Sequence, residues 1–297
     1  MTTRLPWGPM LPRRLTSSLL VAAAAVTLLT ACGSDEPAPF SVGSDGTAAM
    51  RVAAELYAGS IARTGVRVEV RDDSRGDRRL LDDAAQGDLD LFPAFTGDLL
   101  VTLTPAPTAS STEDVEQAVS RALPQGVVIG DPAAVSNRRQ VVLSRSLMDT
   151  AGVTDLADCG ALPPGMPLAT TGKLSADDRA AFGQCRFGAV EEGLTPAEVV
   201  ARVSTGRQLG ALTGLEAASA LAGNDAVTGL RSAESGPMAQ DLVPVYRSAQ
   251  VGKSQMKALS RVAGDLTTTD LAEMAAKVEK GADPAVVARE WLVTRGT

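Results

Sequence analysis

The sequence predicts an α/β protein of two lobes, each built around a sheet rich in parallel strands. Between residues 40 and 92, apolar and helical segments alternate in the order strand, helix, strand, helix, strand, which favours a parallel sheet. The same alternation begins again between residues 140 and 230. Two extended segments, 130–147 and 241–245, lead into and out of this second region. A chain that crosses twice between two such regions forms a clamshell.

The first region is predicted to open with a short apolar strand and an amphipathic helix, in which apolar side chains recur every three or four residues. Gly43 and Gly46 permit a turn between this strand and this helix. An alternating strand, a helix and a third apolar strand follow. The mixed charges of RDDSRGDRRLLDD, residues 71–83, indicate a solvated loop and helix face, although residues 75–77 begin a helix whose N-terminus can point toward the cleft. The five elements are expected at residues 40–42, 48–62, 66–70, 78–85 and 89–92.

Capping residues predict where several later helices begin. Ser111 is followed by a threonine and two acidic residues, which is a favourable start for a helix. Thr195 precedes a proline and marks another start. Asp270, after three threonines, suggests a capped helix near the C-terminus. Further strands are expected at residues 126–129, 208–213 and 225–230.

The crossing segments set the expected domain boundaries. From Cys32 onward about 265 residues remain, enough for one large or two medium domains. We expect one lobe to comprise residues 40–135 and 241–297, and the other to comprise residues 136–240. Both crossings then lie at the hinge.

The N-terminal segment has the features of an export signal. Three arginines precede an apolar stretch at residues 19–28, and the sequence LTAC then ends at Cys32. This arrangement predicts a signal peptide at residues 1–31. It also resembles the bacterial lipobox, which implies that Cys32 is acylated and that the polar residues 32–39 form a tether. An uncleaved transmembrane anchor is the alternative, and the small residues before Cys32 disfavour it.

Charge and hydropathy restrict the partners. The chain holds 28 basic and 35 acidic side chains, and removal of the three arginines of the signal peptide brings the formal charge to about −10. Nucleic acid is therefore not an expected partner. No later apolar segment is long enough to span a membrane. We expect a protein outside the cytoplasm that is held at the cell membrane by its lipid alone.

Three cysteines and the absence of histidine restrict the chemistry. With Cys32 assigned to lipid, Cys159 and Cys185 remain in an oxidising compartment, where we expect a disulfide. Two free thiols or a metal site are the alternatives, and two cysteines without histidine make a poor zinc site. A Ser-His-Asp triad, a Cys-His pair and a HExxH zinc site are excluded. We expect a binding protein with no catalytic residue, metal or cofactor; an enzyme using carboxylates is the least favoured alternative.

The first candidate binding residues follow the first predicted strand, because ligands of parallel sheets bind beyond the carboxyl ends of the strands. Four residues at this turn precede a helix and can offer hydrogen bonds to a polar solute. Simple capping of that helix by one of their side chains is an equally supported interpretation. These residues are Ser44, Asp45, Gly46 and Thr47.

The second candidate segment follows the third predicted strand. Phe92 and Phe95 flank Pro93, so we expect Phe92 to face the core and Phe95 to face the cleft. Thr96 is a further ligand candidate, with helix capping as its alternative role. Asn137 lies at the expected hinge, where it contacts either the opposite lobe or solvent, and we include it among the candidate ligand residues.

Three stretches carry a family resemblance. The most specific is AAQGDLDLFPAFTGDLL at residues 84–100. The others are VGSDGTAAMRVAAELYAGSIARTG at residues 42–65 and LTTTDLAEMAAKVEKGADPAVVAREWL at residues 266–292. Together they resemble the substrate-binding lipoproteins of ABC importers for glycine betaine, choline and related osmoprotectants. The resemblance implies the type II periplasmic-binding fold, in which two lobes close on a solute.

The resemblance also implies a function. The expected protein is a monomer that captures a small polar solute, of the osmoprotectant or quaternary-amine class, and delivers it to an ABC permease subunit. An accessory or sensory lipoprotein that keeps the fold and acts through protein contacts is the alternative. The chain departs from the family pattern at the expected ligand site. Asp45 and Thr47 stand where the family usually has lysine and phenylalanine, and Arg139 and Gln140 stand where a tyrosine is common.

Overall fold

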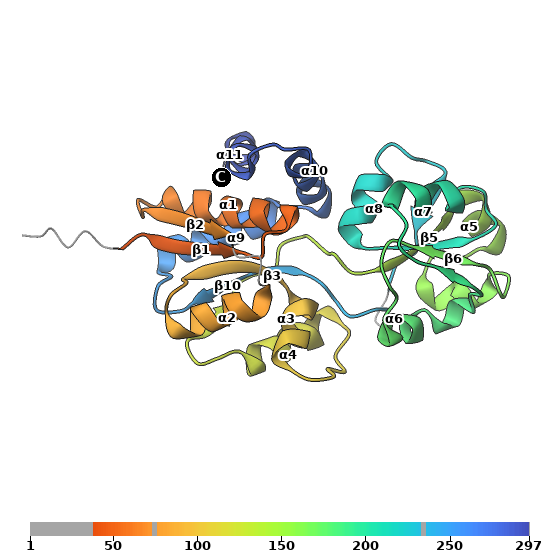
Figure 1. Ribbon diagram of the computed structural model, residues 1–297, viewed down its shortest axis with the longest axis horizontal. Helices are drawn as coiled ribbons and strands as arrows, with labels where there is room; N and C mark the ends of the chain where they lie inside the picture. Colours follow the sequence, from red (N-terminus) through yellow and green to blue (C-terminus); the bar gives the residue numbers. More distant parts are fainter. Residues whose placement is uncertain (1–37, 73–75, 233–235, 297) are drawn as a thin grey trace, which may run out of the picture. The chain divides into compact units, whose positions relative to one another are not determined.

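The computed structural model describes residues 38–72, 76–232 and 236–296 (Figure 1). The signal peptide predicted at residues 1–31 and the predicted acylation site Cys32 lie outside these ranges. Within them, no helix is both long enough and apolar enough to cross a membrane.

The described residues form two five-stranded sheets, of which the first defines lobe I. Its strands are β1 (Phe40–Ser44), β2 (Val68–Asp72), β3 (Leu91–Phe95), β4 (Val127–Ile129) and β10 (Leu242–Arg247). Their order is β2-β1-β3-β10-β4. Strand β1 is parallel to both of its neighbours, whereas β10 is antiparallel to both of its own. The carboxyl ends of β1, β2 and β3 therefore meet at one edge of the sheet.

Helices cover both faces of this sheet (Figure 1). Leu91 and Phe95 of β3 belong to the core on one face, and Phe92 belongs to the core on the other, as the two-residue period of a strand requires. Phe92 is fully buried. The core on the first face includes α1 (Ala48–Ala62), which packs on the sheet, and α9 (Lys253–Asp265), α10 (Thr268–Glu279) and α11 (Pro284–Arg295), which pack against α1. The core on the second face includes α2 (Asp77–Gln86), α3 (Thr96–Leu103) and α4 (Thr112–Ala122).

The second sheet and its helices form lobe II. Its strands are β5 (Gln140–Ser144), β6 (Leu168–Thr170), β7 (Val190–Glu191), β8 (Leu209–Leu212) and β9 (Val227–Gly229), in the order β7-β6-β8-β5-β9. Strand β5 runs antiparallel to both of its neighbours, and β6 runs parallel to both of its own. Both sheets thus contain four strands of one direction and one opposed strand, which confirms the predicted parallel-rich architecture. The helices are α5 (Arg145–Ala151), α6 (Ala176–Ala181), α7 (Pro196–Val203), α8 (Gly214–Ala220) and the short 3-10 helices η1 (Leu156–Ala161) and η2 (Gly183–Cys185).

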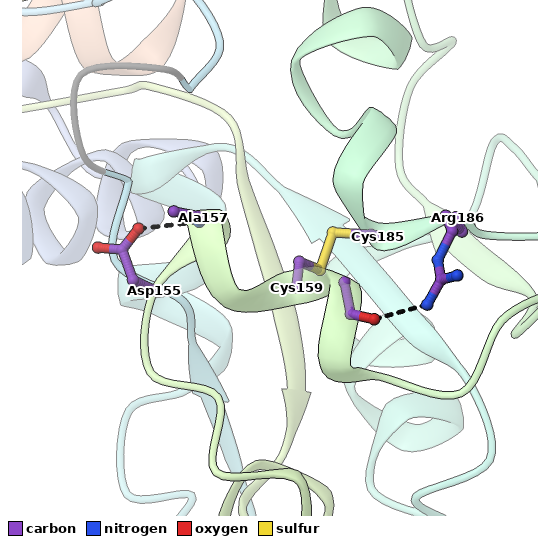
Figure 2. Close-up of a disulfide and its surroundings, with 6 residues drawn as sticks. Asp155, Ala157, Cys159, Cys185 and Arg186 are labelled. Carbon is purple, nitrogen blue, oxygen red and sulfur yellow. Dashed lines mark hydrogen bonds between the residues drawn. A yellow bond between two sulfur atoms is a disulfide. The ribbon is translucent and has the colours of Figure 1, made fainter.

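A disulfide joins η1 to η2 within lobe II (Figure 2). Cys159 and Cys185 are both buried, and their Cα atoms lie 4.6 Å apart. The guanidinium of Arg186 donates a hydrogen bond of 2.6 Å to the carbonyl of Gly160, next to the bridge. The predicted pairing is confirmed. It links two segments that form no strand, and both cysteines belong to a buried core of lobe II.

The third strand is longer than the sequence predicts. The sequence predicts a strand at residues 89–92, which ends before Pro93, yet β3 spans Leu91–Phe95 and includes this proline, which lacks the N–H that a β-ladder uses. Pro93 lies opposite Pro244 of the antiparallel strand β10. Neither proline nitrogen can donate a hydrogen bond. Because the two prolines lie opposite each other, both missing donors fall at one position of the register, and pairing continues on both sides of it. Phe95 consequently ends the strand and leads directly into α3.

Two crossing segments join the lobes and run side by side. The N–H of Asn137 donates to the carbonyl of Gln240 at 2.8 Å, and Ser136 pairs with Asp241 in an antiparallel bridge. The N–H of Ser136 also donates to the hydroxyl of Thr268 at 3.0 Å. The crossings are thereby fixed beside the start of α10.

Candidate functional site

A cavity of about 510 Å³ collects residues from both lobes. Lobe I contributes the loop after β1, the first turn of α1, the end of β3, the first turns of α2 and α3, and one face of α10. Lobe II contributes the first two turns of α8, the residue that precedes them, and Pro196 at the start of α7. Helices α8 and α10 also contact each other. The volume lies in the usual range for a small-molecule site.

Four of the predicted ligand residues line this cavity. Asp45 and Thr47 reach it from the loop after β1, and Phe95 reaches it from the last position of β3. Asn137 lines it from the first crossing segment. Phe95 also belongs to the core of lobe I and is only 8% exposed, so one ring serves both the core and the cavity.

The turn after β1 serves the helix as well as the cavity. Oδ1 of Asp45 accepts hydrogen bonds of 2.8 Å from both the N–H and the hydroxyl of Thr47. Thr47 is the N-cap of α1, and its hydroxyl accepts from the N–H of Met50 at 3.4 Å. The capping role proposed as an alternative is therefore present, and it places the two side chains at the cavity wall.

Three predicted ligand residues do not line the cavity. The buried hydroxyl of Ser44 accepts from the N–H of Gly46 at 3.1 Å and so shapes the turn. Gly46 has φ 86°, a conformation that glycine adopts without strain. The hydroxyl of Thr96 is fully buried and accepts from the N–H of Asp241 at 3.0 Å. Thr96 thus holds the second crossing segment against α3.

Asn137 connects the crossing to lobe II. Its Oδ1 accepts a hydrogen bond of 3.2 Å from the N–H of Leu215, which lies in the first turn of α8 and would otherwise lack an intrahelical partner. Gly214 makes this approach possible, because a Cβ at that position would lie 1.9 Å from the carbonyl oxygen of Ser136. Any larger residue would force α8 away from the crossing.

Apart from Asp45, the acidic side chains in the cavity were not among the ligand residues that the sequence predicts. Two of them lie in the first turns of α2 and α3, which follow β2 and β3, so the strand-end rule is the signal that could have found them. The charge pattern of residues 71–83 predicts a solvated surface, with the helix start at residues 75–77 as the part that can face the cleft, and the fold does bring Asp77 to the cavity wall. No sequence signal connects the two glutamates to this site. The carboxylates, called the acidic group below, are Asp45, Asp77, Asp98, Glu216 and Glu279.

Loss of hydration, and after it the charge of neighbouring carboxylates, raises the pKa of two members of the acidic group. Desolvation, followed by the charges of Asp45 and Asp98, raises the pKa of Asp77 to about 7. Water reaches Asp98 through the cavity, yet partial desolvation raises the pKa of its carboxyl as well. A hydrogen bond of 2.9 Å from the amide of Gln240 opposes that increase, and the charge of Asp45 adds to it.

Two other cavities are less suited to be the primary site. One of about 690 Å³ is lined by Arg138, Arg139 and Arg231. The guanidinium of Arg138 already donates to the carbonyl of Ser110 at 3.2 Å, and that of Arg139 donates to the hydroxyl of Thr170 at 3.0 Å. Another, of about 500 Å³, lies wholly within lobe I. Neither is lined by the residues that follow β1 or β3.

Comparison with known proteins gives a family match. Residues 38–294 match the family model described as the substrate-binding domain of ABC-type glycine betaine transport systems. No curated protein matches the chain.

Solved structures share the fold. Apo YehZ from Escherichia coli aligns with a TM-score of 0.70 at 16% identity, covering 88% of this chain and 99% of that one. A glycine betaine/carnitine/choline ABC transporter structure aligns with a TM-score of 0.72 at 14% identity, covering 86% and 98%. Lactococcal OpuAC, closed on glycine betaine, gives a TM-score of 0.51 at 10% identity, covering 88% and 97%. These alignments confirm the predicted two-lobe, type II periplasmic-binding fold.

Proposed function

Because the chain belongs to the family of substrate-binding domains of ABC-type glycine betaine transport systems, we propose that it captures a small polar solute outside the cytoplasm and delivers it to the permease of an ABC importer. The observation that carries the binding step is the cavity of about 510 Å³ to which both lobes contribute. An osmoprotectant or a related amine is the solute class that the family suggests. The family consists of substrate-binding proteins rather than enzymes.

Domain closure is the proposed mechanism. A solute that touches both lobes binds the closed form more tightly than the open form and shifts the population towards closure. Phe95 and Asp45 supply contacts from lobe I, Glu216 supplies one from lobe II, and Asn137 supplies one from the crossing. The hinge in this proposal lies at the predicted boundaries, between residues 135 and 136 and between residues 240 and 241.

The test is a ligand screen on the purified protein, freed of co-purified solute by dialysis. Thermal stability is measured with betaine, choline, carnitine, amino acids and sugars, and small-angle scattering follows compaction. A solute that raises the melting temperature and reduces the radius of gyration supports capture by closure. A blank across the whole panel contradicts the proposal and favours the accessory or sensory role. The supporting observation for that role is that Phe95 is the single aromatic residue among the described residues of the cavity lining.

Attachment to the membrane is a further part of the proposal. The lipobox-like sequence ending at Cys32 supports cleavage after residue 31 and acylation of the new N-terminus. A single acyl chain binds membranes only reversibly, so stable anchoring needs more than one. Mass spectrometry of the N-terminal peptide tests this directly, and Cys32→Ala is expected to release the protein into the soluble fraction. Light scattering on the released protein tests the proposed monomer.

A further inference from the structure

The cavity carries negative charge that the described protein does not balance. None of its described lining residues is lysine or arginine. No member of the acidic group forms an ion pair with a described residue, whereas carboxylates elsewhere do, as Asp90 does with Arg247 at 3.3 Å. Acidic side chains without basic partners, gathered in a cavity, attract positive charge.

The carboxylates also keep open hydrogen-bonding capacity. In Asp45 and Asp98 the described donors bind Oδ1, and in Glu216 they bind Oε2. The second oxygen of each accepts no hydrogen bond from a described residue. An ionised carboxylate accepts through both oxygens, so each of these side chains retains sites for a charged N–H donor.

The same wall is poor in aromatic faces. A quaternary ammonium group has no N–H and is held by several aromatic rings, each contributing about 0.5–2 kcal/mol. Phe95 is the single aromatic residue among the described lining residues. Carboxylate oxygens therefore dominate the recognition chemistry available here, and they suit a primary amine or guanidinium better than a trimethylated nitrogen.

The acidic group draws its members from both lobes. Among the described residues, no set of three or more His, Cys, Asp or Glu is placed to hold one metal ion. Asp45, Asp77 and Asp98 belong to lobe I, whereas Glu216 belongs to α8 of lobe II. This distribution matches two positive charges separated along one molecule.

We propose that the cavity takes a solute with two cationic, N–H-bearing ends, such as an alkyl diamine or an amine that also carries a guanidinium, in preference to a zwitterionic or quaternary ammonium solute. The inference rests on the proposed function of solute capture and names its substrate class. One cationic end binds the lobe I carboxylates, and the other binds Glu216. Closure then neutralises charge on both lobes at once.

Isothermal titration calorimetry with 1,4-diaminobutane, choline and glycine betaine tests the proposal. We expect the diamine to bind at least about tenfold more tightly than either of the others, and its affinity to fall as sodium chloride is raised. Tighter binding of choline or glycine betaine overturns this inference and leaves solute capture intact. If none of the three binds but another solute of the screen does, the inference also fails alone. If nothing binds, solute capture itself fails.

Charge-neutralising variants locate the site. Asp98→Asn and Glu216→Gln keep the oxygens that accept from Gln240 and Thr213, and glutamine is compatible with the capping box of α8. Each is expected to weaken diamine binding at least about tenfold. Glu273→Gln, on the exposed face of α10 and outside the cavity, is the matched control and is expected to change affinity less than about twofold. Equal effects in all three, or stabilisation by magnesium chloride in place of the diamine, would overturn the assignment.

Discussion

Leu215 donates its backbone N–H to Oδ1 of Asn137 across 3.2 Å, joining the first turn of α8 to the crossing segment. The N–H of Asn137 in turn donates to Gln240 on the second crossing segment. One residue therefore connects both crossings to lobe II and also lines the cavity. This hydrogen bond therefore couples the position of α8 to the crossing segments, where the proposed hinge lies.

Asn137→Ala is expected to reduce both stability and solute affinity. The N–H of Leu215 loses its partner, which costs about 1 kcal/mol of unfolding free energy, and α8 is less firmly placed at the cavity. Urea unfolding and calorimetry measure the two effects. Asn137→Asp, which keeps an acceptor at the same position, is the control and is expected to restore most of the stability. An alanine variant as stable as the parent would show that the contact contributes nothing.

Asp77 is expected to make the unliganded protein less stable as pH rises. Its folded-state pKa is raised to about 7, chiefly by desolvation and then by Asp45 and Asp98. The neutral form is the one favoured by folding, so this contribution is complete below about pH 4 and is lost as pH rises through about 7. Asp77→Asn, which never ionises, should therefore gain on the order of 2 kcal/mol over the parent at pH 8, because the partly exposed side chain does not realise the full effect.

Urea unfolding at pH 5 and pH 8 measures this gain. The difference between Asp77→Asn and the parent should be small at pH 5 and larger at pH 8. Asp82→Asn, exposed on the same helix, provides the charge-matched control. A difference that is the same at both pH values would contradict the assignment of the raised pKa to Asp77.

The disulfide is expected to stabilise lobe II. Cys159 and Cys185 are 26 residues apart in the sequence, and closing a loop of that length restricts the unfolded chain by about 3 kcal/mol in the chain-entropy model. Replacing both cysteines by alanine should lower the denaturation midpoint, and dithiothreitol should lower that of the parent in the same way. Reductant should leave the double variant unchanged. Identical denaturation midpoints for the oxidised and the reduced parent would show that the disulfide does not stabilise the protein.

Substitution of one phenylalanine of β3 is expected to reduce stability, and substitution of the other is expected to reduce solute affinity. Phe92 is fully buried and faces only the core, so Phe92→Leu should lower stability by about 1–2 kcal/mol without changing solute affinity. Phe95 lines the cavity, so Phe95→Leu should weaken the best solute of the screen by about tenfold. Circular dichroism melts and calorimetry on both variants give the comparison. An affinity loss that is the same in both variants would argue against a cavity role for Phe95.

Several elements could be predicted because their signals are local. The helix at residues 48–62 is found at the same bounds, since apolar periodicity and a threonine cap determine it. The strand predicted at residues 66–70 lies two residues later, because alternating side chains do not specify where pairing with β1 begins. The end of β3 was wrong, because the tolerance for Pro93 depends on Pro244, which lies far away in the sequence.

The candidate site likewise contains residues that the local sequence predicts and residues that only distant contacts bring there. Asp45, Thr47 and Phe95 were predicted from the rule that ligands bind at strand ends of a parallel sheet, and all three line the cavity. Thr96 was a ligand candidate, but it is buried against a crossing segment. Asp77 was not a ligand candidate, but it lines the cavity. Neither outcome follows from neighbours in the sequence, since both depend on which distant segment packs against them.

By itself the sequence determined the order of the strands and helices at residues 40–92, the absence of histidine-based chemistry, the disulfide partners and the turn at the end of β1. Those properties follow from composition and from short-range periodicity. Only the tertiary structure decided that carboxylates from α2, α3, α8 and α10 share one cavity without a described basic partner. The physical reason is that charge in a cavity depends on which elements approach one another in space, and long-range packing alone brings those elements together.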